Sequence, residues 1–572
     1  MKKRILTAML AAVMLLGVVS CGNEGGTSAD NGSSESTADA SGAASGERTG
    51  TCEDTGCVWD PYTPYEETVV FTKGASTDTS WTNLPEGDTL TDNFYTRYVK
   101  EQVNVGVELA WTVDPNNAKQ KNALAIASGE IPDVMVVDRQ TFQQLVDNDL
   151  VWDMTDAYEK CISPFLKEQY DQYGENLFKH VRVDGRMMGV PGTKITDLHS
   201  ILWVRQDWLD KVGMEFPQTI DEIKSVAKAF IEQDPGGNGE GKTIGLTATD
   251  TLYGGYGSEF TLDTFFAVYG AYPGQWIEKD GGAAYGSIQP EVKEALAEFA
   301  QMYKDGILDK EFAVRKSTDR AALVSSGQIG IAVGGMWSPS GVLDSVMNNP
   351  EADWTVGPSP LDENGKYKVM ENDPLASILV VSKKFEHPEA IIKALNAQYD
   401  VIRGNGESGS AAYDECMVDS PGLHYMVSPV ELDVSPNFYA KEIHDDIVQA
   451  LEKDDREAMQ IRAFKSVYDM VKKDIEYPKT DKTAYQEHMQ RIYGTEATTA
   501  ECTEDIPCAF FGTTPTMSTK WAALEKLETE TFVKIVMGEK SIDEFDAFVD
   551  QWLKMGGQEI TDEVNDSISN QQ

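Results

Sequence analysis

Basic residues are scarce in this sequence. Over 572 residues, 49 Lys and Arg face 94 Asp and Glu, which gives a formal net charge of −45. Proteins that bind a nucleic-acid backbone need clustered cations, so the composition argues against nucleic acid as a partner. We interpret the acidity as a solvated surface. The length predicts two or more domains with ample core.

Catalytic signatures are also lacking. The sequence contains no G-x-S-x-G, no H-E-x-x-H and no phosphate-binding P-loop. Its six histidines are scattered without ligand spacing, and no cysteines stand in a C-x2-C pair, which argues against zinc. A glycoside hydrolase needs only two carboxylates and has no comparable signature, so this enzyme class stays open as a less favoured alternative.

Cysteine is uncommon as well. The six that follow residue 50 are Cys52, Cys57, Cys161, Cys416, Cys502 and Cys508. The short spacings within Cys52–Cys57 and within Cys502–Cys508 would suit small disulfide loops in an extracytoplasmic protein. We therefore expect these two pairings, although six cysteines allow 15 and free thiols remain an alternative.

The first residues are typical of an export signal. A basic start at residues 2–4 precedes a short apolar run, which is too short to span a membrane and ends in V-V-S-C at Cys21. This ending resembles a bacterial lipobox. We expect residues 1–20 to be a signal peptide and Cys21 to carry the lipid. The membrane contact would then come from the lipid and not from a basic patch.

Large apolar residues are missing from the segment that follows. Residues 22–50 contain no aromatic and no large aliphatic side chain, so they cannot bury enough apolar surface to fold. We expect residues 21–60 to be the lipidated cysteine and a flexible linker that holds a folded domain away from the membrane.

From residue 66 the pattern is that of an α/β protein. Strand-like ETVVFTKG, helical TLTDNFYTRYVKEQVN, strand-like VGVELAWTV, the helix DPNNAKQKNALAIASGEIP capped by Asp114 or Asn116, and the strand DVMVVD follow in turn. A β-α-β-α-β order predicts a parallel sheet whose strand ends collect ligands. Asp138 and Arg139 come directly after the last of these strands, so we expect both at that edge.

Longer phrases carry a family likeness. ASGEIPDVMVVD, LWVRQDWLDKVGMEFPQTIDEIKSVAKAF and GTTPTMSTKWAALEKLETETFVKIVMGEKSIDEFDAFVDQW stand in an order and spacing that resembles the family 1 extracellular solute-binding proteins of bacterial ABC transporters, in their large lipoprotein branch. The resemblance runs from about residue 66 to 567. It implies a two-lobed, type II periplasmic-binding-protein-like fold that captures a sugar or oligosaccharide for an ABC transporter permease as a monomer on the cell surface.

The same resemblance implies that the chain crosses between lobes near HSILWV and near LASILVV. One α/β lobe would hold residues 66–198 and 373–435, and the other 199–372 and 436–567. A tethered surface glycan-binding protein without a transport role is the alternative to delivery.

Sugar sites combine aromatic faces with planar polar groups. Trp337 is the foremost candidate because it follows the strand GQIGIAV in a Gly-Gly loop, and each candidate also has a structural interpretation as core, cap or ion pair. The tryptophans of the expected hinge strand and of the helix after it, Trp203 and Trp208, are expected to pack in the core. The predicted ligand-binding residues are Trp81, Asp138, Arg139, Tyr253, Tyr256 and Trp337.

The stretch DPGGNGEGKT at residues 234–243 resembles a calcium loop that relatives carry as D-P-N-G-N-G-x-x-D-E. Asp234, Asn238 and the turn residue Gly239 keep their places, and Glu240 stands where the family ligand is a backbone carbonyl. Gly236 replaces an Asn, and Lys242-Thr243 replaces an Asp-Glu pair. Calcium takes six to eight oxygen ligands, which this degenerate loop no longer supplies. We therefore expect no metal and no other cofactor, with calcium binding as the less favoured alternative. The Lys242 ammonium would lie near Asp234 in place of the ion.

Overall fold

The computed structural model describes residues 56–76, 82–114, 117–196 and 198–571, all within one compact unit that extends from Cys52 to Gln572. The expected signal peptide, Cys21, nearly all of the expected linker, and Trp81 lie outside the described residues. No helix in the described part of the chain is both long enough and apolar enough to cross a membrane.

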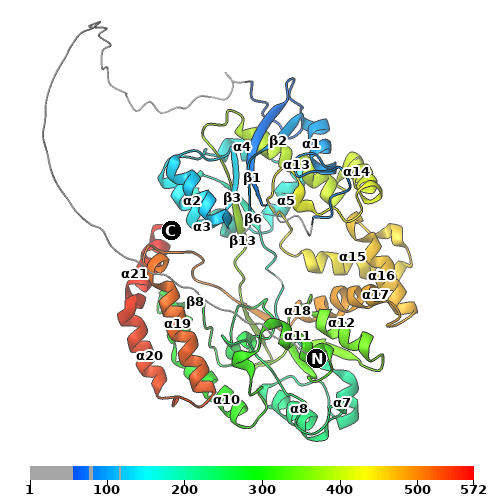
Figure 1. Cartoon of the computed structure of the whole chain (residues 1–572), viewed down its shortest axis with the longest axis vertical. Helices are drawn as coiled ribbons and strands as arrows, with labels where there is room; N and C mark the ends of the chain where they lie inside the picture. Colours follow the sequence, from blue (N-terminus) through cyan, green and yellow to red (C-terminus); the bar gives the residue numbers. More distant parts are fainter. Residues whose placement is uncertain (1–55, 77–81, 115–116, 197, 572) are drawn as a thin grey trace, which may run out of the picture. The chain divides into compact units, whose positions relative to one another are not determined.

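A five-stranded sheet organises the first half of the chain (Figure 1). It consists of β1 (Val69–Ser76), β2 (Val105–Val113), β3 (Val134–Val137), β6 (Val190–Thr193) and β13 (Leu375–Val381), in the order β2-β1-β3-β13-β6. β1 pairs in parallel with β2 and β3, as the β-α-β-α-β pattern predicts. β13 returns from far along the chain and runs antiparallel between β3 and β6.

Helices cap and cover this sheet according to their local sequence. α1 (Phe94–Val103) begins with a capping box at Asn93. α2 (Ala118–Ser128) follows Asn117, which makes no side-chain cap bond, and it ends at Gly129 in the left-handed conformation. The expected cap at Asp114 or Asn116 stays a prediction, because residues 115–116 lie outside the described residues. α13 (Pro388–Arg403) is buried along nearly its whole length.

A second, three-stranded antiparallel sheet has the order β10-β7-β11. It is built from β7 (Ile201–Arg205), β10 (Ile331–Gly334) and β11 (Trp354–Gly357). α8 (Ile220–Gln233) begins with a capping box of Thr219 and Glu222, which the spacing T-x-x-E before an apolar run predicts. Trp203 and Trp208 are fully buried here, as expected.

The chain from residue 439 onward is mostly helical, as its sequence indicates. Its helices are α15 (Tyr439–Lys453), α16 (Lys465–Glu476), α17 (Lys482–His488), the π-helical η8 (Met489–Gly494), α18 (Thr495–Thr498), α19 (Met517–Val536), α20 (Glu544–Trp552) and α21 (Gln558–Gln571). The remaining helices are α3 (Arg139–Asp147), α4 (Thr155–Cys161), α5 (Pro164–Asp171), α6 (Glu175–Phe178), α7 (Gln206–Val212), α9 (Asp263–Val268), α10 (Pro290–Lys304), α11 (Ser317–Ser325), α12 (Pro339–Asn348) and α14 (Gly406–Asp419). The remaining strands are β4 (Arg182–Val183), β5 (Arg186–Met187), β8 (Trp276–Lys279), β9 (Gly282–Tyr285), β12 (Tyr367–Met370) and β14 (Thr503–Ile506).

Buried side chains form separate cores. One draws on residues 65–190 and 375–434, whereas two others draw on residues 201–370 and 485–564. A helical cluster occupies residues 439–492. The chain passes between the first of these cores and the others in three places, which we name the crossing segments: residues 194–200, 371–374 and 435–438. The division into two lobes at the expected boundaries stays a prediction.

The cysteines differ from expectation in one pairing. Cys502 and Cys508 are both free, so the predicted disulfide between them is wrong. Burial raises the pKa of the Cys508 thiol to about 11, which keeps it protonated. Cys57 is disulfide-bonded. Its expected partner, Cys52, lies outside the described residues, so that pairing stays a prediction.

Candidate functional site

The three crossing segments are joined by hydrogen bonds around one threonine. The backbone N–H of Thr196 donates to Oδ1 of Asn437 at 3.2 Å, and its hydroxyl donates to the same oxygen at 2.5 Å. Asn372 completes the set by donating from Nδ2 to the carbonyl of Thr196 at 3.2 Å. All three crossing segments therefore meet at Thr196.

Arg139 borders this junction through an ion pair. It is the first residue of α3, where Asp138 caps the helix by accepting from the N–H of Thr141 at 2.8 Å. The Arg139 guanidinium binds both carboxylate oxygens of Asp373, in the second crossing segment, with Nη2–Oδ1 at 2.8 Å. The N–H of Leu375 also donates to Asp373, at 3.0 Å. The two-pronged pair thus connects the end of β3 to the chain that enters β13.

His180 adds an unpartnered polar group beside this pair. Burial, and then the nearby Arg139 cation, lower the pKa of His180 to about 4, so its ring is neutral at physiological pH. Its Nε2 atom and the Nε atom of Arg139 are both buried without a hydrogen-bond partner among the described residues. Buried polar atoms without partners are costly, and a bound ligand is one way to supply the missing partner.

Trp337 lies beside the first crossing segment. It follows β10, and 38% of its surface is exposed. A Cβ atom placed on Gly257 would lie 3.4 Å from both the Trp337 ring and the carbonyl oxygen of Leu198. A Cβ on Gly335 would come within 2.7 Å of the same ring. Glycine at these two positions therefore lets the indole rest on backbone while part of it remains open to solvent.

The loop beneath Trp337 is fixed to the crossing segment. The carboxylate of Asp263 accepts from the N–H groups of Gly254 and Gly255, each at 3.1 Å. Burial raises the pKa of this carboxyl. The hydroxyl of Ser200 donates to the Ser258 carbonyl at 2.8 Å, and its N–H donates to Tyr256. The loop and the tryptophan above it are thus positioned from the first crossing segment.

The two predicted tyrosines face inward in this structure. Tyr256 is 2% exposed and belongs to a hydrophobic core. Tyr253 donates its hydroxyl to the buried carboxylate of Glu528 in α19. Their side chains are therefore occupied by contacts within the protein. The contributions of Tyr253, Tyr256 and Trp81 to ligand binding stay predictions.

Sequence reasoning missed several residues at this junction. Asp373, His180, Thr196, Asn372 and Asn437 carry no local motif, and Arg139 binds its partner 234 residues away. The one available signal was the position of Asp373 just before LASILVV, where the family resemblance places a crossing between lobes.

The degenerate calcium loop is held by hydrogen bonds from the protein. Asp234 accepts from the Thr243 hydroxyl at 2.6 Å and from the N–H groups of Gly239 and Asn238 at 2.8 and 3.0 Å. These bonds, that of Thr243 foremost, lower the pKa of Asp234. Asn238 also donates to the Gly327 carbonyl at 2.9 Å. The Asp234 carboxylate therefore already has partners.

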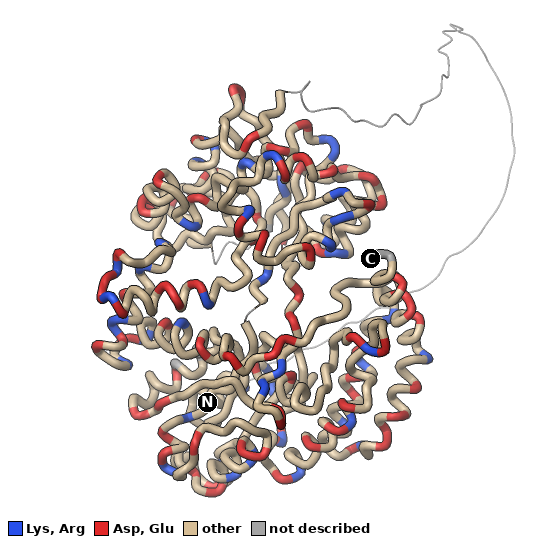
Figure 2. Tube along the Cα trace, turned by 180° about the vertical axis from the view of Figure 1, so that it is seen from behind, with Lys and Arg blue, Asp and Glu red and all other residues tan. Residues whose placement is uncertain are grey.

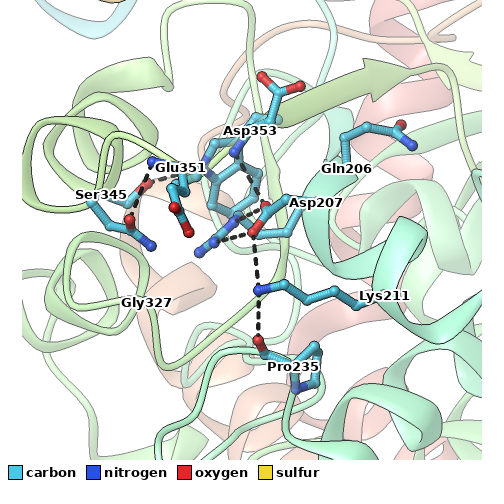
Figure 3. Close-up of polar contacts among 12 residues, drawn as sticks. Gln206, Asp207, Lys211, Pro235, Gly327, Ser345, Glu351 and Asp353 are labelled. Atoms are coloured by element: carbon cyan, nitrogen blue, oxygen red, sulfur yellow. Dashed lines mark hydrogen bonds and ion pairs between the residues drawn. The ribbon is translucent and has the colours of Figure 1, made fainter.

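Lysine enters the loop from a different helix than expected. Lys242 is exposed, and no ion pair joins it to Asp234 in the part of the chain that the structure describes. Lys211 of α7 instead donates to the Pro235 carbonyl at 2.9 Å, while its ammonium lies 3.9 Å from Asp207 (Figure 3). The expectation that Lys242 replaces the metal is therefore not supported, and Lys211 is the cation that contacts this loop.

Packing explains the glycine at the third position of the loop. A Cβ atom on Gly236 would lie 2.4 Å from the ring of Trp208. The guanidinium of Arg205 also stacks on this ring, 4.8 Å from the ring centroid. Two nitrogens of the same guanidinium bind the Asp207 carboxylate, at 2.6 and 2.7 Å. A buried tryptophan thus fills the space that a calcium-binding side chain at residue 236 would need.

The fold and the junction define a class. An order of β2-β1-β3-β13-β6 with an inserted antiparallel strand, separate cores and three crossing segments is the architecture of a two-lobed, type II solute-binding protein. Residues 81–399, more than half of the chain, match the family described as bacterial extracellular solute-binding protein. The chain belongs to this family, whose members are binding proteins located outside the cytoplasm.

Individual relatives agree with this assignment. The chain is 24% identical over 481 residues to lipoprotein LipO of Bacillus subtilis (strain 168), covering 80% of this chain and 85% of that one. It is 21% identical over 483 residues to the polygalacturonan/rhamnogalacturonan-binding protein YtcQ of the same organism, covering 82% and 87%.

Solved structures share the fold. An extracellular solute-binding protein from Bifidobacterium longum subsp. infantis has a TM-score of 0.59 at 17% identity, covering 89% of this chain and 99% of that one. The S. pneumoniae ABC-transporter substrate-binding protein FusA, as an EF-hand mutant in complex with fructo-nystose, has a TM-score of 0.57 at 16% identity, covering 88% and 99%.

Proposed function

We propose that this protein captures an oligosaccharide between two lobes and delivers it to the permease of an ABC transporter. The observation that supports this most is the junction at Thr196, where three crossing segments meet beside Arg139, Asp373 and the unpartnered nitrogen of His180. The lobes would be residues 66–198 with 373–435 and residues 199–372 with 436–567. A lipid on Cys21 would hold the monomer at the outer face of the membrane.

The ligand chemistry is inferred from the groups at the junction and from the relatives. Arg139 and Asp373 neutralise each other while offering donors and acceptors in one plane, which suits sugar hydroxyls. Trp337 would supply an exposed aromatic surface for the C–H face of a sugar ring. YtcQ is named for polygalacturonan and rhamnogalacturonan, and FusA was solved with fructo-nystose. With a neutral ion pair and a net charge of −45, we propose a neutral oligosaccharide for this chain.

Binding would work through a shift between open and closed arrangements. A ligand favours the closed state only through its higher affinity for that state, so it must contact both lobes. Arg139 lies with the first core, whereas Trp337 follows a strand of the second. One sugar chain that contacts both side chains would bind the closed state more tightly than the open state.

The test is a thermal-shift screen followed by calorimetry. We expect a neutral oligosaccharide, such as a fructo-oligosaccharide or a mannan or galactan fragment, to raise the melting temperature and to bind with one-to-one stoichiometry. Polygalacturonate fragments are expected to bind less tightly. Chromatography of the same mixtures should show intact sugar. Turnover of a glycan without stoichiometric binding would favour the hydrolase, and binding without co-purification of a permease would favour a surface glycan-binding protein.

A further inference from the structure

A cluster of potential metal ligands lies away from the junction, where the N-terminal segment meets α13. Cys57, His387 and Glu389 each offer one ligand atom, and these three atoms lie within 4.8 Å of one another. We propose that this cluster is a redox-gated zinc site, closed while Cys57 is in a disulfide and opened when the disulfide is reduced.

The spacing of the three atoms fits zinc. Nδ1 of His387 lies 3.8 Å from Sγ of Cys57 and 3.3 Å from Oε1 of Glu389. With usual zinc–ligand lengths in a tetrahedron, the same separations would be about 3.5 Å for S to N and about 3.3 Å for N to O. Two of the three separations are thus already close to those of a coordination tetrahedron, and the third, between Sγ of Cys57 and the Glu389 carboxylate, is within 4.8 Å. Water can take the fourth position.

Outer contacts hold the histidine and the carboxylate in place. The hydroxyl of Tyr65 donates to Oε1 of Glu389 at 2.7 Å, and Glu389 is fully buried. The ring of His387 packs edge-on against Tyr65 at 5.6 Å and against Phe385 at 6.3 Å. Partners of this kind orient metal ligands and tune their affinity.

The position of Cys57 depends on contacts other than its disulfide. The buried ammonium of Lys393 donates to the carbonyls of Val58 and Asp60, at 3.4 and 3.0 Å, and lies 3.8 Å from the Asp60 carboxylate. Asn396 donates to the Pro61 carbonyl at 3.2 Å. The segment therefore stays docked on α13 after reduction. Because Lys393 is paired with Asp60, a thiolate and Glu389 remain to balance the dication.

The chemistry of opening is a simple reduction. A phosphine takes oxygen from water and becomes a phosphine oxide, while the S–S bond breaks and both sulfurs become thiols. Zinc then binds the Cys57 thiolate, and the thiol proton passes to the buffer. Spacing along the sequence argued against zinc because residue 57 and residues 387–389 are far apart in the chain, and only the fold brings them together.

The experiment compares oxidised and phosphine-reduced protein that retains every residue from Cys52 onward, the whole of the compact unit, titrated with Zn²⁺ against a chromogenic chelator. We expect the reduced protein to bind one zinc ion and the oxidised protein none at this site. Co²⁺ should give the thiolate charge-transfer band of a tetrahedral site. His387→Gln and Cys57→Ser should each lose at least about tenfold in affinity, the size of effect that outer partners alone produce. Tyr65→Phe should lose about tenfold.

His444→Gln is the matched control, because His444 lies on α15 outside the cluster and should leave zinc binding unchanged. Melting temperatures of the zinc-free proteins show whether each variant is folded. Absence of stoichiometric zinc in the reduced wild type would overturn the proposal. The proposal would also be overturned if reduced Cys57→Ser bound zinc as tightly as the reduced wild type, since the metal would then belong to the other thiols.

Discussion

At the scale of single residues, Trp337 separates binding from stability. Its ring is 38% exposed and rests on the backbone of Gly335 and Gly257, so it fills little of the core. We expect Trp337→Ala to weaken oligosaccharide binding tenfold or more, about 1.4 kcal/mol, because the aromatic contact is lost. The melting temperature should change little. Calorimetry and thermal unfolding measure the two effects.

Trp203→Ala is the matched control, since Trp203 is fully buried beside β10. Removing it should lower the free energy of unfolding by roughly 3–5 kcal/mol. The binding role of Trp337 would be contradicted by a Trp337→Ala protein that is much less stable yet binds with unchanged affinity.

Residue-scale prediction succeeded where the signal was local. The capping box at Thr219 and Glu222 and the burial of Trp208 follow from short patterns and from composition. The partner of Arg139 could not be predicted, because an ion pair between residues 234 positions apart depends on the completed fold. For Tyr253 the local sequence was misleading. Its Gly-rich loop indicated a flexible ligand contact, whereas its hydroxyl binds the buried Glu528.

At the scale of elements, α19 carries a buried acid that makes stability depend on pH. Glu528 is fully buried and accepts from Ser287 at 2.5 Å, from Tyr285 at 3.1 Å and from Tyr253. Burial raises its pKa from an ordinary 4.5 to about 7. Between these values the folded state binds more protons than the unfolded state, so the free energy of unfolding falls as pH rises toward 7. The full effect is roughly 3 kcal/mol.

We therefore expect Glu528→Gln, which stays neutral, to lose this part of the pH dependence and to exceed the wild type in stability above pH 7. Denaturant titrations between pH 5 and pH 8 measure it. Glu530→Gln, at an exposed position on the same helix, should keep the wild-type profile. If Glu528→Gln and the wild type lose stability in parallel as pH rises, the buried acid is not the cause.

The loop after α8 is expected to be independent of metal. Its carboxylate, Asp234, is already bonded by Thr243, Gly239 and Asn238, so a chelator should leave the melting temperature unchanged. Thr243→Val should cost about 1.5–3 kcal/mol, the usual value for a hydrogen bond to a charged group. Lys242→Ala should stay within about 0.5 kcal/mol, as surface changes do. A chelator-sensitive melting temperature would show that the loop still holds a cation.

At the scale of the whole molecule, sequence order predicted the parallel β-α-β core but not how the chain closes it. β1, β2 and β3 follow one another with helices between them, which leaves one parallel arrangement. β13 is separated along the chain by more than 180 residues from β3 and from β6, the two strands it pairs with, and it runs antiparallel to both. No local periodicity encodes that pairing. The family resemblance, by implying the crossings between lobes, supplied what periodicity could not.

The crossing segments are where this architecture can be tested. Thr196→Val removes the hydroxyl that donates to Asn437 but keeps the shape of the side chain. We expect it to lower the free energy of unfolding by about 1 kcal/mol and the oligosaccharide affinity several-fold, because closing must then order a looser junction. Small-angle scattering should show ligand-induced compaction only at higher ligand concentration. Thr112→Val, at an exposed position on β2, should leave both unchanged. Lower stability of Thr196→Val with unchanged affinity would make the junction a structural feature without a part in binding.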